Sequence, residues 1–214
     1  DTDASYYRNP LSTGLLFSDD STAEVGGLAI TDKDIVQYDG TDFSLFFDGS
    51  DVGLDSAAIS AFDVISNTEI LLSFKDPVSV NGVGAVDDSD VVKFTASSLG
   101  GDTAGTFSLY LDGSDIDLTR NGEDIDGLSL LPDGSILIST KGVVRTGSTN
   151  ASDEDILQFI PTSLGEDTAG SWGFFLDGSD VGLNDKSEDI NAFSLTSTGQ
   201  LALSVDGAFQ VTGQ

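Results

Sequence analysis

Apolar residues alternate with polar ones in short runs along the chain, and several of these runs recur in the same order. The first run is ISAFDVI at 59–65, IDGLSLL at 125–131 and INAFSLT at 190–196. The second follows a tight turn, as ILLSF at 70–74, ILIST at 136–140 and LALSV at 201–205, and GLLFS at 14–18 is a further copy. Short, partly alternating runs of β-favouring residues predict strands.

A third and a fourth run carry acidic residues at fixed positions. The third begins with a DxD phrase, in DKDIVQY at 32–38, DSDVVKF at 88–94 and DEDILQF at 153–159. The fourth ends in Asp-Gly, in DFSLFFDG at 42–49, TFSLYLDG at 106–113 and SWGFFLDG at 171–178. Gly, Asp, Ser and Asn separate the runs, and no long stretch keeps a helical period, so we expect an all-β protein with very little helix.

The most regular feature is a phrase that occurs three times, as FFDGSDVGL at 46–54, YLDGSDIDL at 110–118 and FLDGSDVGL at 175–183. Its DGSD units begin at Asp48, Asp112 and Asp177, which sets a repeat of 64 and 65 residues. Each repeat holds four predicted strands. The sequence therefore predicts an irregular arm at 1–13 and one β-repeat domain at 14–214, with units at about 14–56, 57–121 and 122–186 and a partial unit at 187–214.

Tandem four-stranded units are typical of β-propeller blades. The segment LSLLPDGSILIST at 128–140 resembles the first hairpin of many bacterial propeller families. The whole unit resembles repeats of secreted proteins from cyanobacteria and other aquatic bacteria, over residues 14–205. This resemblance implies a propeller-like fold and no particular activity. Because three units and a surplus strand do not obviously close a ring, a trefoil or prism is the alternative, and the strand at 190–196 could instead overlap the first unit.

Charge limits the range of partners. The chain has 37 acidic and 8 basic residues, a net charge of −29, which disfavours nucleic acid and anionic membranes and favours divalent cations, basic partners or a salty medium. It has no Cys, His or Met, so disulfides and zinc–thiolate sites are excluded. The first residue is Asp1, not Met, and no long apolar run is present. We therefore expect a processed protein that is secreted, periplasmic or at the cell surface.

The recurring carboxylates are candidate calcium ligands, because Ca²⁺ prefers six to eight oxygen ligands from carboxylates, carbonyls and water. The alternative is that these residues only form turns, since Asp, Gly and Ser bond to their own backbone. Further acids precede the first strand of a unit, at Glu123, Asp124, Asp126, Glu188 and Asp189. The candidate ligands in the DxD and DGSD phrases are Asp32, Asp34, Asp48, Asp51, Asp88, Asp90, Asp112, Asp115, Asp153, Asp155, Asp177 and Asp180.

Enzymatic functions have little support in the sequence. Without His or Cys there is no Ser-His or Cys-His nucleophile system, and carboxylates that recur in every unit do not mark one asymmetric site. Trp172, the single Trp, replaces Phe107 and Phe43 of the other units; it is either a core variation or a sugar-stacking platform. We expect a non-catalytic structural or adhesive module, stabilised by calcium, that pairs with another copy or another protein. The alternative is a protein that binds or cleaves carbohydrate through carboxylates and exposed aromatics.

Overall fold

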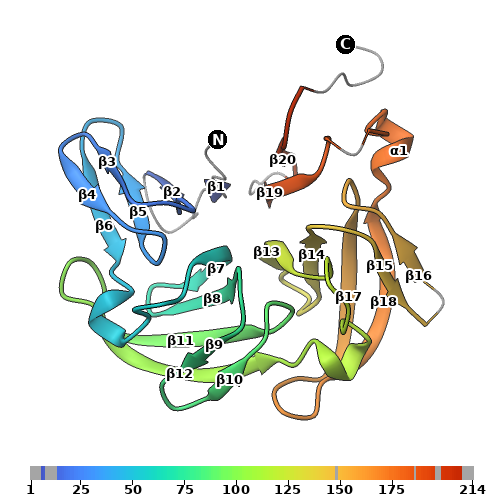
Figure 1. Ribbon diagram of the computed structural model, residues 1–214, viewed down its shortest axis with the longest axis horizontal. Helices are drawn as coiled ribbons and strands as arrows, with labels where there is room; N and C mark the ends of the chain where they lie inside the picture. The colour runs from blue at the N-terminus through green and yellow to red at the C-terminus, as the bar shows by residue number, and fades with distance from the viewer. Residues whose placement is uncertain (1–5, 8–13, 148, 186, 196–198, 209–214) are drawn as a thin grey trace.

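The computed structural model describes residues 6–7, 14–147, 149–185, 187–195 and 199–208, and these residues form an all-β protein (Figure 1). Three four-stranded antiparallel sheets follow one another along the chain, and each has its strands in the order of a simple meander. The first sheet contains β1 (Tyr6–Tyr7), β2 (Leu15–Phe17), β5 (Ile35–Tyr38) and β6 (Phe43–Phe47). The second contains β7 (Ile59–Ser66), β8 (Glu69–Phe74), β11 (Val91–Ser98) and β12 (Ala104–Leu111). The third contains β13 (Ile125–Leu130), β14 (Ile136–Thr140), β17 (Ile156–Ser163) and β18 (Ala169–Leu176).

A two-stranded hairpin of β19 (Ile190–Leu195) and β20 (Leu201–Val205) follows the third sheet. The first strands of successive units contact each other, β7 with β13 and β13 with β19, and β1 also contacts β19. Figure 1 shows these strands around a common centre, with the other strands of each sheet lying outside them. The strand at 190–195 does not supply a first strand to the first unit, because β19 pairs with β20, and residue 196 lies outside the described residues. The strand β2 pairs instead with β1, which lies inside the arm that was expected to be irregular.

Each unit also contains a small hairpin between its second and third strands, which the sequence did not predict. These hairpins are β3 (Ala23–Val25) with β4 (Leu28–Ile30), β9 (Val78–Val80) with β10 (Gly84–Val86), and β15 (Val144–Thr146) with β16 (Thr149–Ala151). Their strands are three residues long, which is too short for an alternating pattern to be recognised. A unit therefore has six strands, of which four belong to the main sheet.

The hydrophobic core lies between neighbouring sheets and not within one of them. Side chains on one face of β8, including Ile70 and Leu72, pack toward the first sheet, whereas Leu71 on the other face packs toward the third. Both faces are therefore covered, which explains why the second strand of each complete unit is a nearly continuous apolar run. At the first of these interfaces the ring of Phe47 lies 5.1 Å from that of Phe94. A third cluster lies between the third sheet and the hairpin β19–β20.

Helix is limited to single turns that follow the fourth strands. In the described part of the chain these are the 3-10 turns η1 (Ser50–Val52) and η2 (Ser114–Ile116) and the helix α1 (Gly178–Val181). The prediction of an all-β chain with little helix is confirmed. No helix among the described residues is long and apolar enough to cross a membrane.

Candidate functional site

The second Asp of each DxD phrase binds backbone amides inside its own sheet. The Oδ2 atom of Asp90 accepts a hydrogen bond of 2.8 Å from the amide of Asp87, and its Oδ1 accepts one of 2.9 Å from the amide of Gly113 in the DGSD loop. A Cβ at position 113 would lie 2.3 Å from the carbonyl oxygen of Ser89, so only glycine permits this approach. Asp34 binds the amides of Thr31 and Gly49, and Asp155 binds those of Ser152 and Gly178.

These three carboxylates are buried, and burial raises the pKa of the Asp90 and Asp155 carboxyls even though the amide hydrogen bonds favour the ionised form. Both oxygen atoms of each carboxylate already accept amide hydrogens. The second Asp of the DxD phrase is therefore a structural residue that ties the start of the third strand to the end of the fourth.

The first Asp of each DGSD phrase forms the turn that follows the fourth strand. The Oδ1 atom of Asp112 accepts hydrogen bonds of 3.0 Å from the amide and 2.6 Å from the hydroxyl of Ser114. Asp48 binds Ser50, and Asp177 binds Ser179, through the same pair of atoms. Hydrogen bonds from residue i+2 to an Asp side chain are typical of Asx turns.

The second Asp of the DGSD phrase reaches into the next sheet. The Oδ2 atom of Asp115 accepts a hydrogen bond of 2.9 Å from the amide of Thr168, and the Thr168 hydroxyl accepts one of 3.0 Å from the amide of Asp112. Asp51 and Thr103 are bonded in the same way at 2.9 Å, with Asp48 donating to the Thr103 hydroxyl at 3.0 Å. These reciprocal bonds join one sheet to the next.

Backbone contacts complete each of these connections. The amide of Gly100 donates to the carbonyl of Phe46 at 2.9 Å, and that of Gly165 donates to the carbonyl of Tyr110 at 2.8 Å. We call these two contact regions the first and second junction; they join residues 45–51 to residues 99–103 and residues 109–115 to residues 164–168. In both junctions the DGSD loop of one sheet binds the loop between the third and fourth strands of the next.

The first Asp of the DxD phrase lies among like charges in two of the three copies. Partial burial, together with the nearby charges of Asp124 and Asp87, raises the pKa of Asp88 to about 6. Partial burial and a hydrogen bond with Asp153 raise the pKa of the neighbouring Glu154 to about 7. In the first unit, Asp32 instead forms an ion pair of 3.2 Å with Lys33.

The acids before the first strand of a unit divide into two groups. Glu123 is 1% exposed and accepts four hydrogen bonds, from the amides of Thr119, Arg120 and Arg145 and from the Arg120 guanidinium. Glu188 is also buried and accepts the amide hydrogens of Asn184 and Asp185. These two glutamates close loops. The other group, Asp124, Asp126 and Asp189, lines a central cavity.

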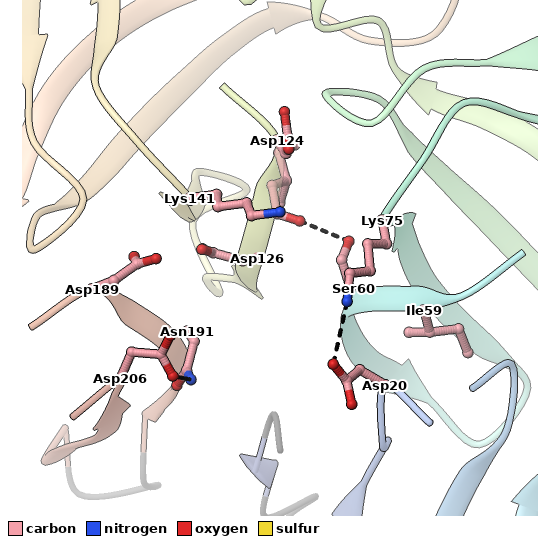
Figure 2. A pocket seen from close by; sticks show the side chains of 11 residues that line it. Asp20, Ile59, Ser60, Lys75, Asp124, Asp126, Lys141, Asp189, Asn191 and Asp206 are labelled. Atoms are coloured by element: carbon pink, nitrogen blue, oxygen red, sulfur yellow. Dashed lines mark hydrogen bonds and ion pairs between the residues drawn. The ribbon is translucent and has the colours of Figure 1, made fainter. Parts of the chain in front are cut away.

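The cavity lies where the first strands of the units begin, and its geometry comes from β-bulges. The pairing of β7, β13 and β19 with their neighbours shifts at Ser60, Asp126 and Asn191 respectively. A bulge re-aims a side chain, and these three all line the cavity. Figure 2 shows them together with charged side chains that follow the second strands, Asp20, Lys75, Lys141 and Asp206.

The cavity is small and predominantly acidic. Five carboxylates line it, from Asp20, Asp124, Asp126, Asp189 and Asp206, against two lysines, and its volume is about 80 Å³. Lys75 and Asp20 form an ion pair of 3.2 Å, and Ser139 donates to Asp126 at 2.7 Å. Sites that enclose drug-sized ligands usually measure roughly 300–1,000 Å³, so a cavity of this size fits water or a small cation and not a sugar ring.

The predicted calcium ligands are not gathered in one place. Among the described residues, no group of three or more acidic side chains is arranged to hold a metal ion. The hydrogen bonds described above give a structural role to the second Asp of each DxD phrase and to both Asp residues of the DGSD loops at the two junctions. Calcium binding by these residues stays a prediction.

Trp172 lies at the second junction. It packs against the core between the second and third sheets, and its indole Nε1 donates a hydrogen bond of 3.2 Å to the carbonyl of Ile116 in η2. Its ring centre lies 4.9 Å from that of Phe159.

The sequence analysis did not identify the two junction threonines, Thr103 and Thr168, as site residues. The sequence signal that could have found them is the DTAG segment at 102–105 and 167–170, which occurs once in each junction.

Comparison with known proteins does not place the chain in a family. No family model and no curated protein matches it. Among solved structures, the chain is similar to the extracellular domain of a one-component system from B. thetaiotaomicron, with 11% identity and a TM-score of 0.38. The match covers 94% of this chain and 30% of that one. At this TM-score, the likeness transfers neither a fold nor a function.

Proposed function

We propose that this protein is a non-catalytic extracellular module, propeller-like in the arrangement of its sheets, that binds other macromolecules. The observation that supports it best is the use made of the recurring acids. Asp51 and Asp115 bind amides of the following sheet, and Asp34, Asp90 and Asp155 bind amides of their own. The repeated motifs therefore build the scaffold, and no repeated carboxylate pair is reserved for chemistry.

The charge of the chain indicates the class of partner. A net charge of −29 creates a negative potential that attracts basic segments and cations and repels anionic polymers. Calcium stabilisation is part of this proposal. The charge of Asp124 repels that of Asp88, and the charges of Asp153 and Asp155 repel that of Glu154. A divalent cation bound nearby would reduce this repulsion. Location outside the cell is part of this proposal and is supported by the strongly acidic composition.

The proposal is tested by titrating the protein with a lysine-rich peptide and, separately, by a hydrolysis screen on polysaccharides. We expect saturable binding of the peptide that weakens as NaCl is raised, and no hydrolysis. A peptide of the same length with glutamate in place of lysine is the control. Hydrolysis that is lost in Asp126→Asn while the fold is kept would show that the cavity carboxylates are catalytic and would overturn the proposal.

Carbohydrate binding is a second candidate, favoured by one groove. This groove, about 630 Å³, runs between η1 and β12 and is lined by Asp51, Asn81 and Phe107. Its volume falls within the range of roughly 300–1,000 Å³ that is usual for ligand sites, and an amide with a carboxylate suits sugar hydroxyls. At the second junction, Trp172 occupies the position equivalent to Phe107 and bonds to η2.

A glycan array separates the two candidates. Binding that is confined to one sugar class, is lost in Asn81→Ala and is kept in Trp172→Phe would assign the groove as a carbohydrate site. Binding to no glycan, together with salt-sensitive binding of the basic peptide, would leave the interaction module as the function.

A further inference from the structure

The two junctions differ beside one aromatic residue of the fourth strand. Phe107 in β12 and Trp172 in β18 are equivalent, since the first pairs with Phe94 and the second with Phe159. In each pair the ring centres lie 4.9 Å apart, at interplanar angles of 47° and 49°. The two rings therefore have the same place in their sheets, and the difference lies between this ring and the turn that follows the fourth strand of the preceding sheet.

At the second junction an indole closes this space. The Nε1 atom of Trp172 donates a hydrogen bond of 3.2 Å to the carbonyl of Ile116, the last residue of η2. The equivalent carbonyl at the first junction belongs to Val52, the last residue of η1. Phe107 has no N–H group in its side chain, and within the described residues no other donor is bonded to the Val52 carbonyl. The first junction therefore keeps a backbone acceptor that the second junction uses.

This acceptor lies at the groove of about 630 Å³ between η1 and β12, which is lined by Val52, Phe107 and Asp51 among others. Asp51 is exposed, and its Oδ2 atom accepts the amide hydrogen of Thr103. No hydrogen bond joins its Oδ1 atom to a described residue, so one carboxylate oxygen stays available to a ligand. The groove thus combines a carboxylate, a backbone carbonyl and an aromatic ring.

Two further positions distinguish this groove from the second junction. Gly53 follows η1, and a Cβ at this position would lie 2.6 Å from the Nδ2 atom of Asn81, so the amide of Asn81 lies directly against the end of η1. The equivalent residues at the second junction are Asp117, which follows η2, and Gly147, which follows β15. The side-chain amide, with an oxygen that can accept a hydrogen bond, is therefore placed at the first junction only.

These groups suit a cation that carries several N–H donors. The acceptors belong to Asp51, Val52 and Asn81, and none of the described residues that line the groove is basic. A guanidinium group is planar, always charged, has five N–H donors in a fixed fork and packs against aromatic rings. An ammonium group is a more strongly hydrated point charge. The charge of Asp51 and the net charge of −29 favour such a cation over a neutral sugar.

We propose that the groove at the first junction binds the guanidinium group of an arginine side chain in a basic segment of a partner protein. This inference rests on the proposed interaction function and names the side chain that the partner supplies. The guanidinium donates to the Val52 carbonyl, as Trp172 donates to the Ile116 carbonyl at the second junction. It also donates to the carboxylate of Asp51 and packs against Phe107. The second junction binds no such group, because its own indole has this place.

The test compares three peptides of equal charge. Each has four lysines around a central residue, which is arginine, asymmetrically dimethylated arginine or lysine. Methylation keeps the charge of arginine and blocks its paired hydrogen bonds. In calorimetric titrations at low salt, the arginine peptide should bind the protein about tenfold more tightly than the other two. In a nuclear magnetic resonance titration, its amide shifts should concentrate at residues 50–53, 81–82 and 104–107.

Matched variants of the protein identify the groove. Phe107→Trp should lower the affinity for the arginine peptide to that for the lysine peptide, because the new indole donates to the Val52 carbonyl and fills the space beside it. Asn81→Gly, which introduces the residue type of the second junction, should weaken the arginine peptide and leave the lysine peptide unchanged. Trp172→Phe is the control, because it makes the opposite ring exchange at the other junction and should keep the preference for arginine. Thermal melting shows that each variant is folded.

Three results would overturn the inference: equal affinity for the three peptides, a preference for arginine that survives Phe107→Trp, or resonance shifts away from the groove. Salt-sensitive binding of the lysine peptide alongside any of these results would show that the proposed function stands without the arginine site. Failure of all three peptides to bind would overturn both.

Discussion

The carboxylate of Asp115 accepts a hydrogen bond of 2.9 Å from the amide of Thr168, a residue that lies 53 positions further along the chain and in the next sheet. The same bond joins Asp51 to Thr103. Because each bond is accompanied by a return bond from the aspartate of the same loop, the two sheets are fixed in orientation as well as in distance.

Replacing Asp115 by Ala should destabilise the fold. The substitution leaves the Thr168 amide without its charged acceptor, which typically costs about 1.5–3 kcal/mol for a bond to a charged group, and less at a site that water reaches. We expect a loss of about 1–2 kcal/mol, or about 2–8 °C in melting temperature for a chain of this size. Asp180→Ala is the matched control, because it alters the same motif outside a junction; its effect should stay within about 0.5 kcal/mol. Equal losses in the two variants would contradict a structural role of the junction.

Trp172 should be more important for stability than its counterpart Phe107. Trp172→Phe removes the hydrogen bond to the Ile116 carbonyl and leaves space beside Phe159. Together these changes should cost about 1–3 kcal/mol in urea-induced unfolding. The reverse change, Phe107→Trp, places an indole beside an existing groove and should alter stability by less than about 1 kcal/mol. A neutral Trp172→Phe would indicate that the indole hydrogen bond is not maintained in solution.

The stability of the protein should increase as the solution becomes mildly acidic. The pKa of Asp88 is raised to about 6 and that of Glu154 to about 7, so the folded state binds these protons more tightly than the unfolded state does. The stabilisation is complete below the ordinary pKa of each group and is lost as the pH rises through its folded value. Between about pH 8 and about pH 5 we expect a gain on the order of 1 kcal/mol, since both side chains are partly exposed and solvent screens their repulsion.

Two conservative variants test this assignment. Asp88→Asn and Glu154→Gln remove the ionisable groups, so the double variant should unfold with a free energy that changes less over this range of pH. Denaturant melts at several pH values measure the difference. An unchanged pH dependence in the double variant would assign the effect to the remaining acids.

Calcium should raise the melting temperature more than sodium at the same ionic strength. A cation that binds only the folded protein stabilises it by about 2.7 kcal/mol at a hundredfold excess over its Kd, whereas screening supplies no coordination. Asp153→Asn should reduce the gain, because this residue lies beside Glu154 and accepts none of the amide hydrogen bonds that hold Asp155. Equal melting temperatures in EDTA and CaCl₂ would leave the DxD and DGSD phrases as turn formers, and equal gains in the two salts would indicate general screening.

Local patterns predicted the strands of each main sheet except β1, because their alternation and their turn residues act within a few positions. The run at 70–74 and the turn at Pro132–Gly134 are examples, since Ile70, Leu71 and Leu72 are all buried and Gly134 has a φ of 87°. The small hairpins β9–β10 and β15–β16 escaped prediction because three-residue strands carry no period. The bulge at Asp126 likewise has no local signature, since it depends on how β13 pairs with β14.

The candidate site was predicted only as a set of residue types. The DxD and DGSD acids were correctly recognised as recurring, but their partners could not be deduced from composition. Asp90 binds Gly113, 23 residues away, and Asp51 binds Thr103, 52 residues away. Such pairs depend on the packing of whole sheets. A carboxylate that binds an amide and one that binds calcium have the same sequence, and only the surrounding structure distinguishes them.

The short turn at Asp39–Asp42 gives the array of sheets a polarity. Every junction has a donor side, the Thr-bearing loop, and an acceptor side, the DGSD loop, and both point the same way along the chain. The first unit has an acceptor loop at Asp51 and, in place of the Thr-bearing loop, the tight turn at Asp39. The bonds between the sheets therefore run in one direction, from the DGSD loop of one sheet to the Thr-bearing loop of the sheet that follows it in the chain.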